Sequence, residues 1–498
     1  MDKRRQFLAV TFLIPLIAAA LGPFQVGDLA VWVAHGLASL ERGEILRHDV
    51  FSVLPTEPLV YPAWAISIVY GLIYRLGGLL SIAYFHIAAA LLLIWLIYRS
   101  SIWKISEPSA PLVRVAVYFS WLGSLVVVGT RPNTLALIPF FVSFLMISRI
   151  ESFQHLTKRK ILLLSLIATI WANLHGSFVL LPLLLTWKLV VLLIRDFFCR
   201  IPLRANIARS LVSVSSVFTS TLLNPFGLQV YPYVLTTSKY SRERHITEWM
   251  STTIFRDFPL GVSFYILAGG ILWILYKRLR AGRFLETLSS PMIPLIALGF
   301  TAIRNAALPF VVLLPTLFSW GFLQSWGEFP KSSPMEPDGR LRKTGRLAFL
   351  GVMLVAAVVS LMPQLRAEIS PLLPKKNRQM FDEDAIPGIA AWIRESGQNC
   401  PIFNSWSYGS YLMLSTRNRI FIDTRNIIYS QEQFKILQSV IGAQPGWQAY
   451  LKKYGACFAV IDEYDNGIFI EAALQSGNWR KIMTERGAVL LERVRPEK

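Results

Sequence analysis

The chain has 498 residues, of which 54% are hydrophobic and only 16% are charged, and its mean hydropathy is +0.47. A soluble protein carries roughly a quarter charged residues, so this composition excludes a soluble enzyme, a disordered chain and a fibrous protein. The formal net charge is +20, but the basic residues form no aromatic-basic pattern of the kind that binds nucleic acid. Composition therefore predicts a polytopic α-helical membrane protein.

Apolar runs in chain order predict about 11 transmembrane helices, and the first is expected to be retained because no small-residue cleavage site precedes Pro23. The predicted spans are 6–24, 79–98, 112–129, 133–148, 161–174, 178–194, 210–224, 259–276, 291–303, 306–325 and 346–363. If a further apolar run at 60–76 crossed the membrane, every later loop would lie on the opposite side. Lying along the membrane surface instead, it leaves most loop Lys and Arg on the cytoplasmic side, as the positive-inside rule favours.

This arrangement places the N-terminus in the cytoplasm and both the long first loop and the tail on the extracytoplasmic side. The predicted domains are a transmembrane module over 1–364, which includes an outer loop at 25–78 with membrane-surface helices, a linker at 365–379, and a soluble α/β domain over 380–498. In the tail, strands are expected near 401–403, 419–423, 457–462, 481–484 and 489–493, with a hairpin turn at Glu485-Arg486-Gly487. Helices are expected at 384–396, 430–441, 444–453 and 466–476.

The three cysteines form no CxxC pair, which argues against a zinc or redox motif. Cys400 and Cys457 lie in the same domain and can pair, but their strand-like surroundings favour two buried thiols.

Polar residues collect at the predicted outer ends of the helices, where ionisable groups at membrane depth are expensive and usually functional. Asp28 follows the first span closely and is a candidate general base, or alternatively the N-cap of a helix that begins near Leu29. Asp49 is a second candidate catalytic carboxylate, or a turn residue. Together the two carboxylates could hold a divalent cation.

Candidate phosphate-binding residues follow at later outer turns. Arg131-Pro132 and Arg304-Asn305 each place a planar guanidinium beside an apolar span, where it can bind a phosphate or simply reach the interface. His175 can bind phosphate, relay a proton or have a purely structural role. Residues that could line an acceptor site or lid are Asn173, Asn224, His245, Glu248 and Trp249.

At these residues the chain resembles the GT-C superfamily of integral-membrane glycosyltransferases, which includes protein O-mannosyltransferases, aminoarabinose transferases and oligosaccharyltransferases. More closely, it is similar to a branch of bacterial membrane proteins whose first loop reads D-x7-G-x6-G-x5-D-x-F-S, here Asp28, Gly36, Gly43, Asp49, Phe51 and Ser52. Further matches are Arg131-Pro132, the W-A-N-x-H-G run Trp171–Gly176, Asn224–Gly227, Glu248-Trp249 and Arg304. The tail matches F-N-x4-G-x-Y-L at Phe403–Leu412 and F-I-D-x-R at Phe421–Arg425.

The resemblance implies an inverting transferase of the bacterial cytoplasmic membrane that takes a sugar from a polyprenyl-phosphate donor. Asp28 would deprotonate an acceptor hydroxyl on a glycan, lipid or protein, while Arg131, Arg304 and His175 would neutralise the leaving phosphate in one outer chamber. No cofactor is required, although Mg²⁺ or Mn²⁺ at Asp28 and Asp49 stays open. Relatives often carry an acidic residue and a histidine where this chain has Val26 and Trp32, which argues against a metal.

Two other functions remain open from the residues alone. One is a transporter or flippase for a lipid-linked glycan, although no matched halves with broken helices are evident. The other is a non-catalytic subunit of an envelope assembly complex. In the tail, Asp423-Thr-Arg425 predicts a structural salt bridge in preference to a sugar site.

Overall fold

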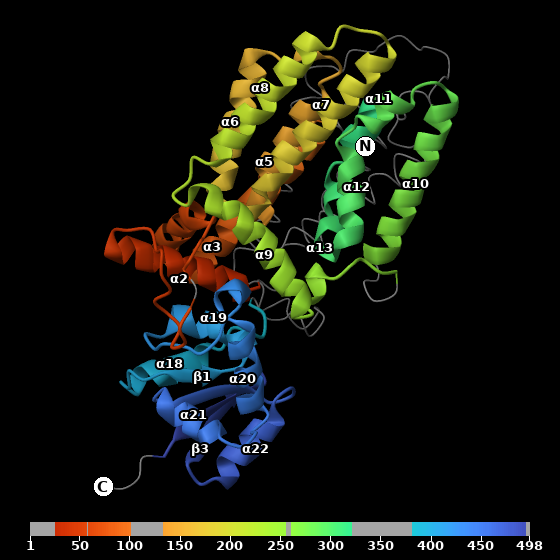
Figure 1. Cartoon of the computed structure of the whole chain (residues 1–498). Coiled ribbons are helices and arrows are strands. Elements are labelled where there is room, and N and C mark those ends of the chain that lie inside the picture. Colours follow the sequence, from red (N-terminus) through yellow and green to blue (C-terminus); the bar gives the residue numbers. More distant parts are fainter. Residues whose placement is uncertain (1–24, 57, 101–132, 255–259, 321–380, 495–498) are drawn as a thin grey trace, which may run out of the picture. The chain divides into compact units, whose positions relative to one another are not determined.

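The computed structural model describes residues 25–56, 58–100, 133–254, 260–320 and 381–494 (Figure 1). They fall into two compact units. The helical unit includes the described residues of Ala83–Val234 and Ser241–Pro374, and the α/β unit includes those of Pro23–Ile82, Leu235–Tyr240 and Lys375–Lys498. The predicted spans 6–24, 112–129 and 346–363 lie outside the described residues.

The helical unit is a bundle in which α5 packs on α6 and α7, and both α6 and α7 pack on α8. Its main helices are α5 (Asn133–Ser148), α6 (Lys158–Ala172), α7 (Leu180–Phe198), α8 (Arg204–Thr221), α9 (Val230–Glu243, in part), α10 (Leu260–Arg280) and α12 (Met292–Thr301). Short elements between them are η2 (Phe153–His155), η3 (Gly176–Val179), η4 (Gly227–Gln229), η5 (Thr247–Trp249), α11 (Phe284–Leu288), α13 (Ile303–Ala306), α14 (Leu308–Val311) and α15 (Leu313–Ser319). Buried aromatic residues, among them Phe140, Phe144, Trp171 and Phe264, fill the interior.

The apolar runs within the described residues coincide with helices, but few of these helices are long. Within the described ranges, three helical stretches are long and apolar enough to cross a membrane, at Trp64–Ile97, Gly176–Phe198 and Leu260–Arg280, and shorter apolar helices lie at Thr134–Ser148 and Met292–Thr301. The run predicted as one span at 306–325 is divided into α13, α14 and α15 over its described part. The protein is thus mostly helical with apolar spans, while the number eleven stays a prediction.

The ambiguous run at 60–76 forms the first part of α3 (Trp64–Ser100), whose helical dihedrals break at Gly77 and Gly78. Gly78 has a φ of 64°, which favours glycine because other residues rarely adopt it. This break separates the run from the span predicted at 79–98. Whether the first part lies along the membrane surface stays a prediction.

The sheet of the α/β unit has the order β1-β2-β4-β3. The strands are β1 (Ile402–Asn404), β2 (Phe458–Asp462), β3 (Trp479–Glu485) and β4 (Ala488–Arg493), with β1 parallel to β2 and the other pairs antiparallel. The helices are α18 (Pro387–Glu395), α19 (Trp406–Ser415), α20 (Gln431–Ile441), α21 (Trp447–Lys453) and α22 (Gly467–Gln475), with η8 (Asn426–Ile428). The predicted hairpin is confirmed, because β3 and β4 meet through Arg486 and Gly487, which both have positive φ.

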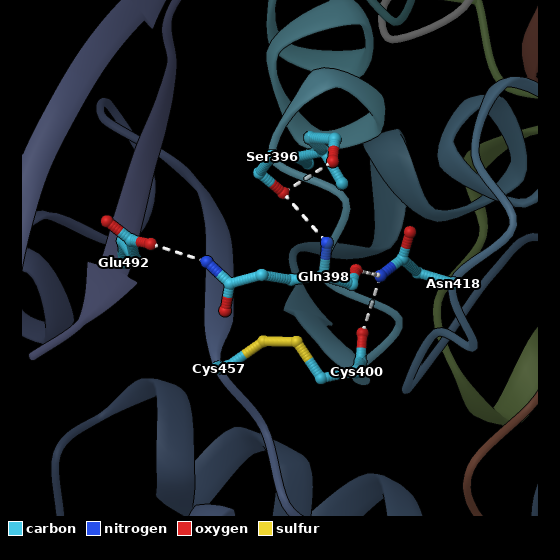
Figure 2. Close-up of a disulfide and its surroundings, with 7 residues drawn as sticks. Ser396, Gln398, Cys400, Asn418, Cys457 and Glu492 are labelled. Atoms are coloured by element: carbon cyan, nitrogen blue, oxygen red, sulfur yellow. Dashed lines mark hydrogen bonds between the residues drawn. A yellow bond between two sulfur atoms is a disulfide. The ribbon is translucent and has the colours of Figure 1, made fainter. Parts of the chain in front are cut away.

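A disulfide joins Cys400 and Cys457, whose Cα atoms lie 6.0 Å apart (Figure 2). Cys400 lies two residues before β1 and Cys457 directly precedes β2, and because these strands are parallel neighbours the two cysteines lie side by side. Figure 2 also shows Asn418 donating to the carbonyl oxygens of Gln398 and Cys400. The preference for two free thiols was therefore wrong, because the spacing of the cysteines does not reveal that their strands pair in parallel.

The first loop completes the α/β unit. Helix α2 (Gly27–Arg42) packs on α19, and Val26, Ala30, Val31 and Ala34 belong to the same apolar core as the sheet residues Ile402, Phe458 and Leu490. The predicted strand at 419–423 is not a strand, although Ile420 forms isolated parallel bridges with Ser52 and with Ile402. Residues some 370 positions apart in the sequence thus share one core.

Candidate functional site

Asp28 lies in the first turn of α2 and is partly exposed. The helix begins at Gly27, two residues before the expected start near Leu29, and its N-cap is Val26, so the alternative of Asp28 as the cap residue is wrong. The Val26 backbone N–H instead donates to both carboxylate oxygens of Asp382, each at 3.2 Å. A carboxylate in the first turn interacts favourably with the helix dipole.

Asp49 is almost fully buried, with 1% of its side chain exposed. One carboxylate oxygen accepts from the Arg425 guanidinium at 2.5 Å and from the Phe51 N–H at 3.2 Å. The other accepts from the Ser52 N–H at 2.9 Å. Asp49 therefore stabilises a turn and forms a buried ion pair, which favours a structural role over a catalytic one.

Arg425 is the centre of a buried cluster from both parts of the α/β unit. Its guanidinium donates to Asp423 at 2.8 and 2.5 Å, and it lies 3.1 Å from His35 Nε2. Asp423 also accepts from the Tyr429 hydroxyl at 2.7 Å. The structural salt bridge predicted for Asp423 and Arg425 is confirmed, and it extends to the first loop through Asp49.

The environment of the cluster lowers the pKa values of both His35 and Asp423. Burial lowers the pKa of His35, and the Arg425 charge lowers it further, so the ring is neutral. Because a guanidinium only donates, His35 Nε2 must be the acceptor in that contact. The Arg425 charge and its hydrogen bonds hold the pKa of Asp423 below its ordinary value despite complete burial, which acts the other way.

In the helical unit, Arg304 of α13 lies beside two predicted site residues. Its guanidinium stacks over the Trp249 ring at 4.2 Å from the ring centroid and lies 3.4 Å from a carboxylate oxygen of Glu248. The backbone fixes this arrangement, since the Ile303 N–H donates to the Met250 carbonyl at 3.0 Å. About a quarter of the Arg304 side chain is exposed, so the group can exchange an ion-pair partner.

His175 caps η3, because its Nδ1 accepts from the Ser177 N–H at 3.1 Å and contacts the Ser177 hydroxyl at 2.7 Å. Desolvation by burial lowers its pKa to about 3, and the Arg304 charge contributes to the shift. The ring is therefore neutral, and a backbone donor on Nδ1 leaves the ring hydrogen on Nε2. The structure thus brings together His175, Arg304, Glu248 and Trp249 within one unit.

The remaining predicted residues make local structural contacts. The Asn173 amide donates to the Thr169 and Leu223 carbonyls, which ties the end of α6 to the turn after α8. Asn224 shapes its own turn by accepting from the Phe226 N–H, and the Asn305 amide reaches the Thr301 hydroxyl at 3.4 Å. His245 is exposed and has a φ of 54°. Arg131 lies outside the described residues.

A divalent cation finds little support in these side chains. Among the residues that the structure describes, no group of three or more His, Cys, Asp or Glu could hold a metal ion. The Asp49 oxygens already accept from a guanidinium and two backbone amides. The described donors therefore do not fit Mg²⁺ or Mn²⁺ at Asp49.

Sequence reasoning did not identify His35 or a link between Arg425 and the first loop. A signal was present for the histidine, since Asp28, Trp32 and His35 have the spacing of one helical face. No local pattern could link Arg425 to Asp49, because 376 positions separate them.

No family model and no curated protein matches this chain. Among solved structures, the archaeal oligosaccharyltransferase AglB from Archaeoglobus fulgidus, in complex with an inhibitory peptide and a dolichol-phosphate, aligns with a TM-score of 0.51 at 12% identity, covering 98% of this chain and 74% of that one. Its apo form aligns with a TM-score of 0.49 at 12% identity, covering 95% and 71%. ArnT from Cupriavidus metallidurans, bound to undecaprenyl phosphate, aligns with a TM-score of 0.46 at 13% identity, covering 99% and 98%. The first of these likenesses shows that the chain has the fold of an oligosaccharyltransferase, as the resemblance to the GT-C superfamily predicts.

Proposed function

We propose that this chain is a membrane glycosyltransferase that moves a sugar from a polyprenyl-phosphate donor to an acceptor hydroxyl on the extracytoplasmic face. The observation that carries the proposal is the fold likeness to an oligosaccharyltransferase along 98% of the chain. That protein is described with a dolichol-phosphate and an inhibitory peptide bound. A polyprenyl phosphate is the class of donor lipid that the resemblance implies, and a protein is one of the implied classes of acceptor.

Arg304 is proposed to bind the donor phosphate. Loss of the sugar leaves a polyprenyl phosphate with more negative charge than the donor had, and a fixed guanidinium in a low-dielectric site stabilises that charge as it develops. The Trp249 ring holds the guanidinium plane, while the contact of 3.4 Å with Glu248 is long enough to yield to a bidentate phosphate. Arg131 is kept as a second candidate for the same role.

His175 is proposed to assist as a neutral donor. With Nδ1 engaged by Ser177, its Nε2–H can donate to a phosphate oxygen without adding charge. A ring whose pKa is lowered to about 3 stays neutral over the whole physiological range, so this donor does not depend on pH.

Asp28 is proposed as the general base. It would take the proton of the acceptor hydroxyl as the oxygen attacks the anomeric carbon, the bond from that carbon to the phosphate oxygen breaks, and polyprenyl phosphate leaves with inversion. Its partly exposed carboxylate can accept a proton from an incoming hydroxyl, whereas the buried Asp49 cannot without breaking its ion pair. No step requires a metal ion.

The disulfide between Cys400 and Cys457 supports an extracytoplasmic tail, because disulfides persist in oxidising compartments and are rare in the cytosol. Together with the distribution of loop charges, it supports a cytoplasmic N-terminus. We place the protein in the bacterial cytoplasmic membrane, in contact with membrane lipids.

The test separates donor binding from chemistry. Purified full-length protein in lipid nanodiscs is titrated with undecaprenyl phosphate, and glycans of a deletion strain are profiled after complementation. Arg304→Gln should weaken undecaprenyl phosphate binding at least tenfold, while Asp28→Asn should bind normally and fail to restore the glycan.

Arg283→Gln is the matched control, since Arg283 is exposed and lies at the start of α11; it should resemble the wild type in both assays. Full complementation by Asp28→Asn would overturn the proposed base. Movement of an intact lipid-linked sugar across vesicles, without cleavage of its phosphate bond, would favour the transporter instead.

A further inference from the structure

The first-loop motif has a structural explanation at nearly every position after Asp28. A Cβ on Gly36 would lie 1.7 Å from the Ser67 carbonyl oxygen, so only glycine lets α2 and α3 cross this closely. Gly43 ends α2 with a φ of 68°. The Phe51 ring stacks on His35 at 5.4 Å and lies 5.5 Å from the Arg425 guanidinium. The motif therefore describes how the loop is built and what it is built against.

The tail motif holds the segment that carries Arg425. The buried Asn404 amide donates to the Ile422 carbonyl at 2.7 Å, and its carbonyl oxygen accepts from the Phe421 N–H at 3.1 Å. A Cβ on Gly409 would lie 1.8 Å from the Ile422 oxygen, so glycine allows α19 to approach this segment. The Ser410 hydroxyl lies 3.1 Å from that of Thr424. These contacts fix the backbone from which Arg425 reaches the first loop.

Arg425 of the tail motif contacts two polar side chains of the first loop through its guanidinium. It contacts Asp49 and His35 from the first loop while Asp423 orients it from its own segment. A lysine has one nitrogen and cannot make these contacts together. Burying such a cluster is expensive, and an apolar replacement would often be as stable, so stability alone does not explain it. The best-attested gain from a buried ionic cluster is a single defined register.

The register that it defines is that of α2, and Asp28 is on this helix. His35 lies seven residues after Asp28, hence on nearly the same face of the helix. At the N-terminal end of α2, a Cβ on Gly27 would lie 3.7 Å from the methyl group of Thr424. Thr424 directly precedes Arg425 in the chain. The Asp423–Arg425 segment therefore contacts α2 both beside Asp28 and two turns further along.

We propose that Arg425 is a positioning residue, which sets the placement of Asp28 by clamping the first loop to the tail through Asp49 and His35. The proposal rests on the proposed role of Asp28 as base. In this scheme the tail domain contributes no catalytic group. It completes the packing and the ion pairs of the catalytic loop.

The experiment compares Asp49→Asn and Arg425→Lys with the wild type. Asp49→Asn keeps the side-chain shape and one turn acceptor while it removes the charge. Hydrogen exchange is followed over residues 27–42 and 49–56, undecaprenyl phosphate binding is measured in nanodiscs, and turnover is measured with the undecaprenyl-phosphate-linked sugar that the wild type uses. Both variants should speed exchange in both segments at least tenfold, lower kcat at least tenfold, and leave the Kd for undecaprenyl phosphate within twofold.

The control is Arg480→Lys, because Arg480 also pairs with a carboxylate, Glu492, but is two-thirds exposed and lies on the edge strand β3. It should match the wild type in all readouts. Unchanged exchange in 27–42 with both variants would overturn the clamp, as would fast exchange combined with a wild-type kcat. If the wild type transfers no sugar, the proposed function fails while the exchange arm still tests the clamp.

Discussion

Asp28 and Asp49 are both aspartates of one loop, yet the structure places them in opposite environments. Asp28 is partly exposed in the first turn of α2, whereas Asp49 is buried with its charge matched by Arg425. The sequence shows two acidic residues at a motif spacing and cannot distinguish them, because the partner of Asp49 lies 376 positions away. Roles at this scale depend on desolvation and pairing, which only the folded chain defines.

His35 provides a prediction at the same scale. Its folded pKa lies well below 6.5 because of burial and the Arg425 charge, with Asp423 acting in the opposite direction. Below pH 6.5 the unfolded chain binds a proton that the folded chain does not, so stability should fall as the pH falls. Between pH 6.5 and 5 the α/β unit should therefore become progressively less stable.

The measurement is hydrogen exchange of the α/β unit from pH 5 to 8 in the wild type and in His35→Gln, which can accept from Arg425 but does not titrate. The variant should show a flatter profile. His175, also neutral in the fold, is common to both proteins and cancels in the comparison. Equal losses of stability in the two proteins would show that His35 does not govern this range.

At the scale of elements, apolar runs predicted the positions of most helices because burial of a continuous apolar surface depends on local composition. Helix α19 was missed, since Trp406–Ser415 mixes serine and glycine with aromatic residues and shows no clear apolar stripe. Its small residues allow close packing, since a Cβ on Gly409 would lie 1.8 Å from the Ile422 carbonyl oxygen. The strand predicted at 419–423 was wrong for a different reason. Ile420 forms isolated bridges with Ser52 of the first loop and with Ile402, and the local sequence does not reveal these partners.

The crossing of α2 and α3 leads to a second prediction. Gly36→Ala places a methyl group 1.7 Å from the Ser67 carbonyl oxygen, which forces the helices apart and should lower the free energy of unfolding by about 3 kcal/mol. Gly467→Ala is the matched control, since a Cβ at Gly467 meets no atom within 4 Å; it should change stability by less than about 1 kcal/mol. Denaturant unfolding of both variants checks this, and equal stability would contradict the tight crossing.

At the scale of the whole molecule, the sequence predicted a transmembrane module followed by a separate tail. The described chain instead groups the first loop with the tail in one compact unit. Hydropathy could not show this, since it reports where a segment is buried and not which distant segment buries it. The proposed membrane topology and the disulfide are properties of the whole molecule, and each leads to a prediction.

The disulfide should contribute substantially to the stability of the tail. Cys400 and Cys457 are 57 residues apart, so in the chain-entropy model the cross-link is worth about 4 kcal/mol. The double variant Cys400→Ala/Cys457→Ala should therefore unfold at clearly lower denaturant concentration than the wild type. Thiol counting in the unreduced, denatured wild type should find one reactive cysteine, Cys199, and three after reduction; three before reduction would contradict the pairing.

The proposed topology predicts that two exposed positions react from opposite sides. Cys199, which is free and exposed, should be cytoplasmic and protected from a membrane-impermeant maleimide in intact cells. A cysteine at Tyr464, which is 85% exposed in the tail, should be labelled without lysis when Tyr464→Cys is made in a Cys199→Ser background. Labelling of Cys199 in intact cells, or none at residue 464, would reverse the assignment of sides.

The contact between Asp49 and Arg425 also has a consequence for biosynthesis. A ribosome adds roughly 5–20 residues per second, so the 376 positions between the two partners correspond to roughly 20–75 s of translation. Throughout that interval the nascent loop exists without its counter-charge and without the surface that covers α2. Maturation of the loop therefore has to wait until nearly the whole polypeptide has been made, and a nonsense mutation shortly before codon 425 would leave an inserted protein whose loop never matures.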